Sequence, residues 1–177
     1  MSSDQHHFVS YLEGIRDGSD LSRARAVLAT LRRGLGKEPG EDANVMRYIV
    51  PHLPAEAPPC RERPYFLIAS LFALHPEQGG TGDMGNHFAA IRQSKPNEDA
   101  IERRFTALLN THEDDLAYHL RQAVSLCKAN RVPVDWHQLF RDVQGWGHPN
   151  RWVQRNWAKS FWGRTPAEQQ PDPATDQ

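Results

Sequence analysis

The chain has 177 residues, of which 38% are hydrophobic and 24% are charged, which is enough for one domain or two tightly packed small lobes. It contains no run of 18 apolar residues, and its start, MSSDQHHFVS, lacks a basic segment followed by an apolar block, so we expect neither a membrane span nor a secretory signal. The formal net charge of −1 does not indicate a strongly basic protein, and the two cysteines are too few for a disulfide framework, so we expect a cytoplasmic protein.

Apolar residues recur with helical spacing along most of the chain, whereas alternating apolar and polar runs of useful length and Asn-Gly hairpins are missing from the sequence. In chain order, the pattern predicts helices over about 6–16, 21–34, 44–49, 64–75, 86–94, 97–110, 115–130, 132–143 and 150–162. The sequence therefore predicts an all-α protein, a compact bundle of about eight or nine short helices without a sheet.

The predicted helix opened by Pro64 is apolar nearly all round, so we expect it to be the central buried element. The Pro-rich linker before it suggests an organisation in two lobes, 6–58 and 64–163, as an alternative to a single helical domain over 1–163. The remaining segment, 164–177, is polar and Pro-rich with nothing to bury, so we expect a disordered tail.

Two further local patterns concern the second and eighth helices of this series. In the second helix, the apolar stripe is expected to begin at Leu21. Before the eighth helix, Asp135 and Gln138 have the spacing of a capping box, in which each side chain bonds the backbone N–H of the other residue.

The last predicted helix contains the sequence NRWVQRNWAKSFW, with Asn150 as a plausible N-cap. An apolar stripe with a spacing of four residues is formed by Val153, Trp157 and Phe161. A cationic stripe on the roughly opposite side is formed by Arg151, Arg155 and Lys159. Such a helix is either an ordinary amphipathic packing element with a solvated outer face or one that also binds a partner. The second interpretation is favoured if other helices also present spaced cations.

Cations are indeed in excess in one part of the chain, because residues 101–164 contain ten Lys/Arg and six Asp/Glu, whereas residues 1–100 contain 11 and 13. On the other helices and the segment that follows one of them, the candidate nucleic-acid-binding residues are Arg32, Arg33, Arg103, Arg104, Arg121, Lys128 and Arg131. Each pair alone fits a solvated helix face. Spaced arginines on several helices fit a surface that follows phosphates, because the guanidinium fork matches phosphate geometry. Binding of this kind is salt-dependent and weak in sequence preference.

Evidence for catalysis is weaker. The segment HEDDLAYH offers His112, Asp115 and His119 as ligands for a metal-dependent hydrolase, but no HExxH motif is present, and acids in a first helical turn are explained by the helix dipole. The segment GGTGDMG lacks the Gly-Lys-Ser/Thr ending of a phosphate loop, although it leads into a helix start where a phosphate could bind. No serine or cysteine lies beside a recognisable base. We therefore predict no catalytic residue, metal or cofactor.

The order of segments resembles the CasB family, the small subunit of the type I-E CRISPR surveillance complex, Cascade. The resemblance runs from about residue 8 to residue 162, and it rests on LATLRRG, PYFLIASLFALHP, GDMGNHFAAIR, AIERRFTALLN, LAYHLRQAVSLCKANRVPVDWHQLFRDVQGW and VQRNWAKSFW. Its most specific parts are IERRF followed by LL and the VDW…L…D…W block.

The resemblance implies an all-helical, non-enzymatic subunit, of which two copies lie head to tail against the backbone subunits that hold the guide RNA. Further expected partners are the large subunit and the target and displaced DNA strands of the R-loop, which a basic face helps to hold. It also implies that Arg32, Arg33, Arg103, Arg104 and Arg121 belong to that face, whereas Lys128 and Arg131 are additions from the residue pattern. Two alternatives stay open, the hydrolase above and a pure scaffold whose cations bind an acidic protein.

Overall fold

The computed structural model describes residues 3–56, 58–94 and 98–163, so the predicted disorder of segment 164–177 lies outside the described residues. Within these ranges the regular structure consists of nine α-helices and two short 3₁₀ helices, without a strand, as the sequence predicted. In chain order they are α1 (Ser3–Asp17), α2 (Leu21–Arg32), α3 (Ala43–Ile49), η1 (Val50–His52), α4 (Pro59–Leu74), α5 (Met84–Gln93), α6 (Glu98–Leu109), η2 (Glu113–Asp115), α7 (Leu116–Ala129), α8 (Trp136–Gly145) and α9 (Trp152–Trp162).

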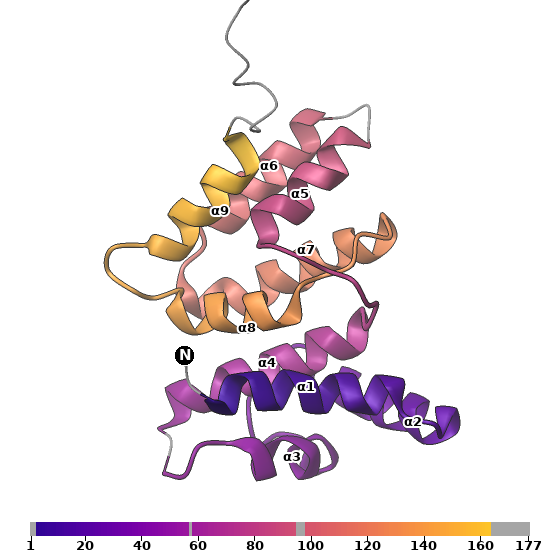
Figure 1. The fold of residues 1–177 in the computed structure, drawn as a ribbon. Helices are drawn as coiled ribbons and strands as arrows, with labels where there is room; N and C mark the ends of the chain where they lie inside the picture. Colours follow the sequence, from indigo (N-terminus) through magenta and orange to yellow (C-terminus); the bar gives the residue numbers. More distant parts are fainter. Residues whose placement is uncertain (1–2, 57, 95–97, 164–177) are drawn as a thin grey trace, which may run out of the picture.

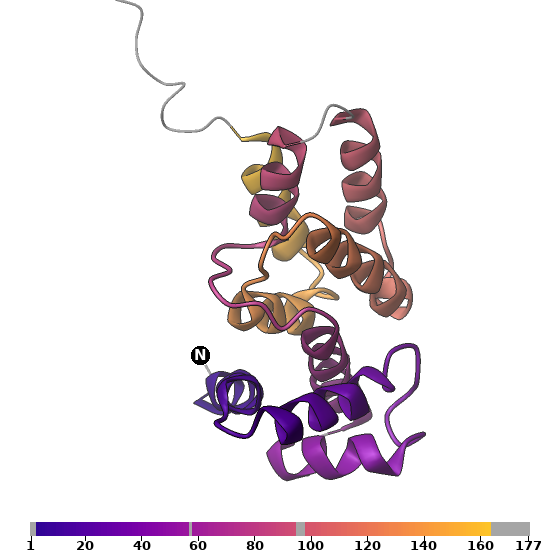
Figure 2. The ribbon, with the colours of Figure 1, turned by 90° about the vertical axis from the view of Figure 1, so that its right-hand side faces the viewer.

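The helices are stacked in layers (Figure 1). Helices α1 to α4 form one end of the molecule, α7 and α8 lie across the middle, and α5, α6 and α9 form the other end, an arrangement that the rotated view also shows (Figure 2). Helix α4 packs against α2 and also against α7 and α8, so it joins its own end of the molecule to the middle layer. The division into two lobes stays a prediction. No helix in the described ranges is long and apolar enough to cross a membrane.

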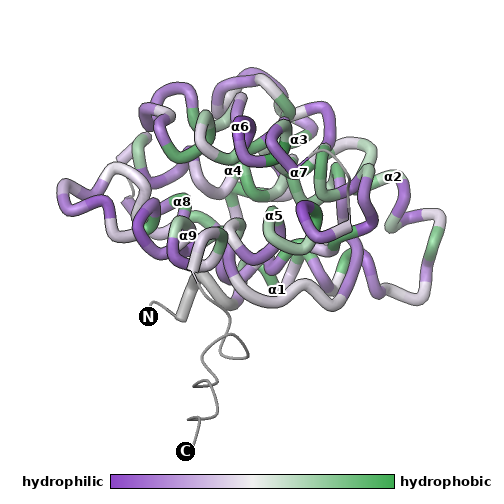
Figure 3. The backbone as a smooth tube through the Cα atoms, turned by 90° about the horizontal axis from the view of Figure 1, so that it is seen from above, coloured by the Kyte–Doolittle hydropathy of each residue, from purple (hydrophilic) through white to green (hydrophobic). Residues whose placement is uncertain are grey.

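Helix α4 is the central buried element that its composition predicted, because every residue from Ile68 to Ala73 is buried. Figure 3 shows hydrophobic segments near α4 and α5 and mainly hydrophilic outer turns. The predicted start of α4 was wrong, since the helix begins at Pro59 and contains Pro64. Proline is tolerated in the first helical position, where the missing N–H would have had no helical partner.

Two smaller predictions also need correction. Leu21 was expected in the apolar stripe of α2, but it is 63% exposed, because the buried stripe consists of Ala24, Val27 and Leu31. Asp135 accepts a hydrogen bond from the backbone N–H of Gln138 (2.9 Å), which is one half of the expected capping box. The Gln138 side chain donates instead to the Asp142 carboxylate (2.8 Å).

Helices α5 and α9 pack at very short range. A Cβ atom on Gly85 of α5 would lie 2.1 Å from the backbone oxygen of Trp157 in α9, so only glycine permits this approach. The Trp157 side chain is fully buried, and its ring lies 5.0 Å from that of Trp146. Helix α9 is therefore a packing element along the stripe predicted from Val153, Trp157 and Phe161, all three of which are buried.

The buried carboxyl group of Asp142 joins α8 to α9. One of its oxygens accepts a hydrogen bond from the Trp157 indole nitrogen (2.7 Å), and the other accepts one from Gln138. Burial raises the pKa of Asp142 to about 6, although both hydrogen bonds act in the opposite direction. The folded protein thus holds a proton at this carboxyl more tightly than the unfolded chain does.

We expect Gly85→Ala to lower the free energy of unfolding by about 1–3 kcal/mol, because α5 and α9 must move apart to admit the methyl group. The matched control is Gly14→Ala in α1, where an added Cβ meets no atom within 4 Å and the change should gain up to about 1 kcal/mol of helix propensity. Urea unfolding followed by circular dichroism measures both effects. Equal stability of the two variants would contradict the packing described for α5 and α9.

We expect Asp142→Asn to change the pH dependence of stability. Because the raised pKa favours the protonated folded state at low pH, the wild-type protein should lose stability from this group as the pH rises from about 4 to about 6. The asparagine variant lacks this loss. The free energy of unfolding of the variant relative to that of the wild-type protein should therefore rise by up to about 3 kcal/mol over that interval, at about 1.4 kcal/mol per pKa unit. Chemical unfolding of both proteins at pH 4, 5, 6 and 7 tests this, and a constant difference would refute it.

Candidate nucleic-acid interface

The ten cations predicted from the sequence to bind nucleic acid are all exposed. We call them the basic surface residues: Arg32, Arg33, Arg103, Arg104, Arg121, Lys128, Arg131, Arg151, Arg155 and Lys159. Between described residues, no ion pair within 4.0 Å involves any of them, whereas Arg16, Lys37 and Arg63 each pair with a carboxylate. The charges of the ten residues are therefore not neutralised by direct ion pairs with acids in the described part of the chain.

Arg121 lies beside a turn that follows another exposed arginine, Arg33, from a distant part of the sequence. Arg33 follows the last residue of α2, and Gly36 lies three residues further on with a positive φ of 78°. The position of a Cβ on Gly36 is 3.8 Å from Nη1 of Arg121 in α7. The fold thus brings the guanidinium of Arg121 next to the turn that follows Arg32 and Arg33 in the chain. Local sequence patterns could not place these groups together, because Arg33 and Arg121 are 88 positions apart in the chain.

Arg32 also has a structural role. Its Nε and Nη2 atoms both donate to the backbone oxygen of Ala73, at 3.0 and 2.8 Å, so it satisfies a carbonyl in the last turn of α4. A cation at this position also interacts favourably with the dipole of α4. Because a guanidinium has five N–H groups, this contact leaves donors that can still reach a phosphate.

The predicted cationic stripe placed Arg151 within the last helix, but Arg151 lies just before it. It is the N-cap of α9 in a left-handed backbone conformation (φ 50°), and its Nη2 donates to the backbone oxygen of Leu109 (2.6 Å) at the end of α6. The prediction of Asn150 as the N-cap was wrong by one residue, because Asn150 precedes the N-cap; its side chain accepts a hydrogen bond from the Trp152 backbone N–H (3.1 Å). Arg155 and Lys159 lie on the exposed side of α9.

The remaining basic surface residues lie on or just after two helices that pack together, α6 and α7. In α6, Ile101 and Phe105 face the core, which leaves Arg103 and Arg104 on the solvent side. In α7, Arg121 and Lys128 are seven residues apart and share one exposed line. Arg131 follows the end of α7 in a left-handed conformation (φ 56°). These cations can contact phosphates without disturbing the core.

The alternative of a metal-dependent hydrolase finds no site in the described residues, where no group of three or more His, Cys, Asp or Glu side chains could hold a metal ion. His112 is exposed and caps the short helix η2, with its Nδ1 accepting from the Asp114 backbone N–H at 3.4 Å. His119 instead packs with its ring 5.3 Å from that of Tyr118. The two histidines proposed as metal ligands are thus engaged in local structure.

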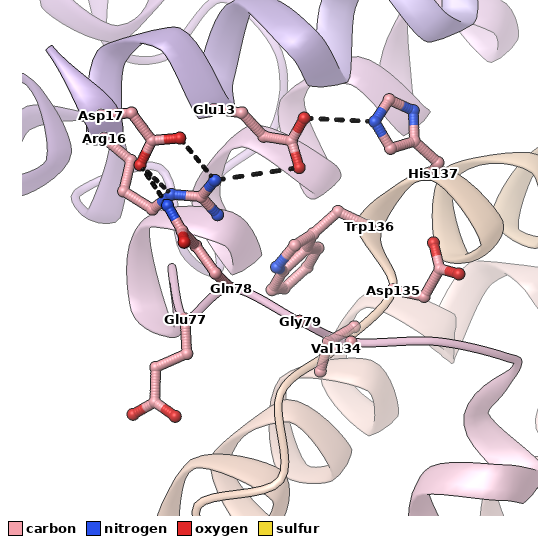
Figure 4. A pocket seen from close by; sticks show the side chains of 11 residues that line it. Glu13, Arg16, Asp17, Glu77, Gln78, Gly79, Val134, Asp135, Trp136 and His137 are labelled. Atoms are coloured by element: carbon pink, nitrogen blue, oxygen red, sulfur yellow. Dashed lines mark hydrogen bonds and ion pairs between the residues drawn. The ribbon is translucent and has the colours of Figure 1, made fainter.

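Sequence reasoning missed a pocket of about 330 Å³ whose lining contains none of the basic surface residues (Figure 4). Its walls come from the end of α1, from the loop after α4 and from the start of α8. Three short segments separated by more than 50 residues form it, so no local motif could have revealed it.

Comparison with known proteins gives one consistent result. Residues 27–162 match the sequence profile of the family described as "CRISPR-associated protein Cse2 (CRISPR_cse2)". A protein of that description from Thermus thermophilus is 31% identical over 170 residues, which cover 95% of each chain.

Solved structures agree with this result. The crystal structure of a Cse2-family protein from Thermus thermophilus has a TM-score of 0.74 and 30% identity, covering 93% of this chain and 100% of its own. A chain in a structure described as "CRISPR RNA-guided surveillance complex, pre-nicking" has a TM-score of 0.73 and 25% identity, covering 89% of this chain and 91% of its own. The chain described here therefore belongs to the Cse2 family of CRISPR-associated proteins, also known as CasB, as its sequence motifs predicted.

Proposed function

We propose that this protein is a non-catalytic small subunit of the type I-E CRISPR Cascade complex, which binds nucleic-acid backbone through its basic surface residues. In this role it stabilises the target DNA and the displaced strand of the R-loop during defence directed by a guide RNA. Membership of the Cse2 family supports the proposal, as does the likeness to a chain of an RNA-guided surveillance complex. The proposed partners are the backbone and large subunits, a second copy of the chain, the guide RNA and both DNA strands, in the cytoplasm.

The observation that carries the nucleic-acid part of this proposal is the position of Arg121 beside the turn after Arg33. Arg121 in α7 and Arg33 just after α2 are both exposed, and a phosphate bound near this turn could accept hydrogen bonds from cations of two separate segments. Guanidinium groups bind phosphate oxygens through paired, charge-assisted hydrogen bonds. Backbone contacts of this kind carry no sequence information, which suits a protein that must accept any target.

Weak contacts are sufficient for the proposed role. Formation of an R-loop exchanges one duplex for another of similar stability, so a few protein contacts to the backbone can shift the balance. The net charge of −1 suggests that the free protein binds DNA weakly. In an assembled complex, other subunits hold the DNA close by, and each contact then acts at a high effective concentration.

A pure scaffold is the second candidate function, because the exposed cations can equally pair with acids on a protein partner. The two functions differ in a simple way. A phosphate-binding surface retains salt-dependent affinity for plain DNA, whereas a surface built for one acidic protein has no reason to prefer a nucleic acid.

We expect Arg104→Glu and Arg121→Glu each to weaken binding of labelled single-stranded and double-stranded DNA by about tenfold at low salt, since each reversal removes a phosphate contact and adds repulsion. Fluorescence anisotropy at two salt concentrations measures the affinity, which should fall steeply with salt in the wild-type protein. In the described part of the chain, neither side chain bonds a backbone carbonyl as those of Arg32 and Arg151 do, so folding should be unchanged.

The matched control is Arg61→Glu, which reverses another exposed arginine outside the basic surface residues and should leave affinity within about twofold of wild type. Equal losses in all three variants would indicate a general charge effect and would contradict the proposed surface. Unchanged affinity in the Arg104 and Arg121 variants would contradict it as well. If the wild-type protein binds a backbone subunit in a pull-down but binds no DNA at any salt concentration, the scaffold becomes the better account.

A further inference from the structure

The pocket between α1, the loop after α4 and the start of α8 has an acidic lining. Its charged residues include four carboxylates, from Glu13, Asp17, Glu77 and Asp135, and one arginine, Arg16 (Figure 4). Arg16 is bound to Asp17 through two hydrogen bonds of 2.7 and 2.8 Å. This pairing holds the pKa of Asp17 below its ordinary value, so the carboxyl is an anion at neutral pH. Arg16 pairs with Asp17 and approaches Glu13 at 4.0 Å, so Glu77 and Asp135 have no guanidinium partner in the lining, and the pocket favours a cation.

The four carboxylates differ in how much of their bonding capacity is already used. Glu13 contacts the ring of His137 at 3.3 Å and Arg16 at 4.0 Å, while Asp135 caps α8. Glu77 lies at the outer edge, with its side chain 53% exposed, and it approaches the buried His75 ring at 4.0 Å. In Figure 4 the Glu77 carboxylate extends away from the other acids, so it can meet a cation at the rim of the pocket and not deep inside it.

A second observation points to a ligand in this pocket. Trp136 is only 2% exposed, and its buried indole nitrogen has no hydrogen-bond partner among the residues that the structure describes. In Figure 4 this nitrogen lies on the side of the ring that faces Gln78 and Arg16, toward the space that the lining residues enclose. An indole N–H can only donate, so it requires an acceptor such as a carbonyl oxygen. Leaving a buried donor unpaired is unfavourable, which gives an incoming acceptor an advantage here.

The pocket wall is held by close backbone packing. A Cβ on Gly80 would lie 2.1 Å from the carbonyl carbon of Val134 and 2.5 Å from the backbone nitrogen of Asp135. The loop after α4 therefore lies directly on the segment that leads into α8, and only glycine allows this contact. Gln78 in the same loop donates to Asp17 at 2.7 Å, which fixes the opposite wall. The pocket is consequently formed by bonded and closely packed segments on both sides.

We propose that this pocket is a docking site for an arginine- or lysine-bearing peptide segment of a protein partner. The cationic side chain of the segment lies at the rim beside Glu77, where the other lining acids also attract it, and a backbone carbonyl of the segment accepts the hydrogen bond from Trp136 Nε1. A volume of about 330 Å³ is at the lower end of ligand-sized pockets and suits one side chain with its peptide group. An anionic ligand is disfavoured by the four carboxylates. This site is independent of the proposed nucleic-acid surface.

The test is a titration of the full-length protein, labelled with ¹⁵N at its tryptophans, with the tripeptide Ac-Gly-Arg-Gly-NH₂. The indole N–H signal of Trp136, assigned by Trp136→Phe, should shift and saturate, while the signals of the other four tryptophans stay in place. The same peptide with citrulline in place of arginine, which is nearly isosteric and uncharged, should bind about tenfold more weakly. Ac-Gly-Glu-Gly-NH₂ should give no shift.

Glu77→Gln should lower the affinity for the arginine peptide by about tenfold, because it removes the charge at the rim with almost no change in the size of the side chain. The matched control is Glu41→Gln, another exposed acid outside the pocket, which should leave the titration unchanged. The proposal is overturned if the Trp136 signal does not move at high millimolar peptide, if the glutamate peptide moves it equally, or if Glu77→Gln has no effect. Each of these results is separate from any result on DNA binding.

Discussion

The close approach of α5 and α9 at Gly85 is the constraint on which much of the structure depends. It places the backbone of Trp157 against α5 and so fixes the depth at which the Trp157 ring enters the core. From there the indole nitrogen reaches the buried Asp142 carboxyl of α8. Helix α8 packs in turn on α1 and α4. One glycine and one tryptophan thus connect helices from both ends of the stacked layers.

This packing also determines which cations remain exposed. The helices use their apolar stripes for the core, and arginines near helix ends are divided between structure and solvent. Arg32 and Arg151 donate to carbonyl oxygens in the last turns of α4 and α6, so they stabilise helix ends while they remain exposed. Arg121 has no such bond among the described residues and lies beside the turn after α2. The proposed interface therefore combines cations that also bond backbone carbonyl groups with cations that are available only to a partner.

The helices and the buried stripe of α9 could be predicted from the sequence, because helical periodicity is a local property. The start of α4 could not, because Pro64 has the pattern of a first helical residue but lies inside the helix, where proline is normally unfavourable. The proximity of Arg121 to Gly36 depends on how α2 and α7 are placed in space, and the pocket around Trp136 depends on three distant segments. Such sites arise from tertiary packing, and a single sequence contains no direct signal for them.

The most direct test of the proposed function is the lifetime of the R-loop in a reconstituted complex that carries either the wild-type chain or an Arg33→Glu/Arg121→Glu variant. Permanganate reactivity of the displaced strand, followed over time, measures this lifetime, and the mass of the complex reports its assembly. The account predicts complete assembly in both cases and an R-loop that closes about tenfold or more faster in the variant, since phosphate contacts are lost. A fully assembled variant complex with an unchanged R-loop lifetime would contradict it.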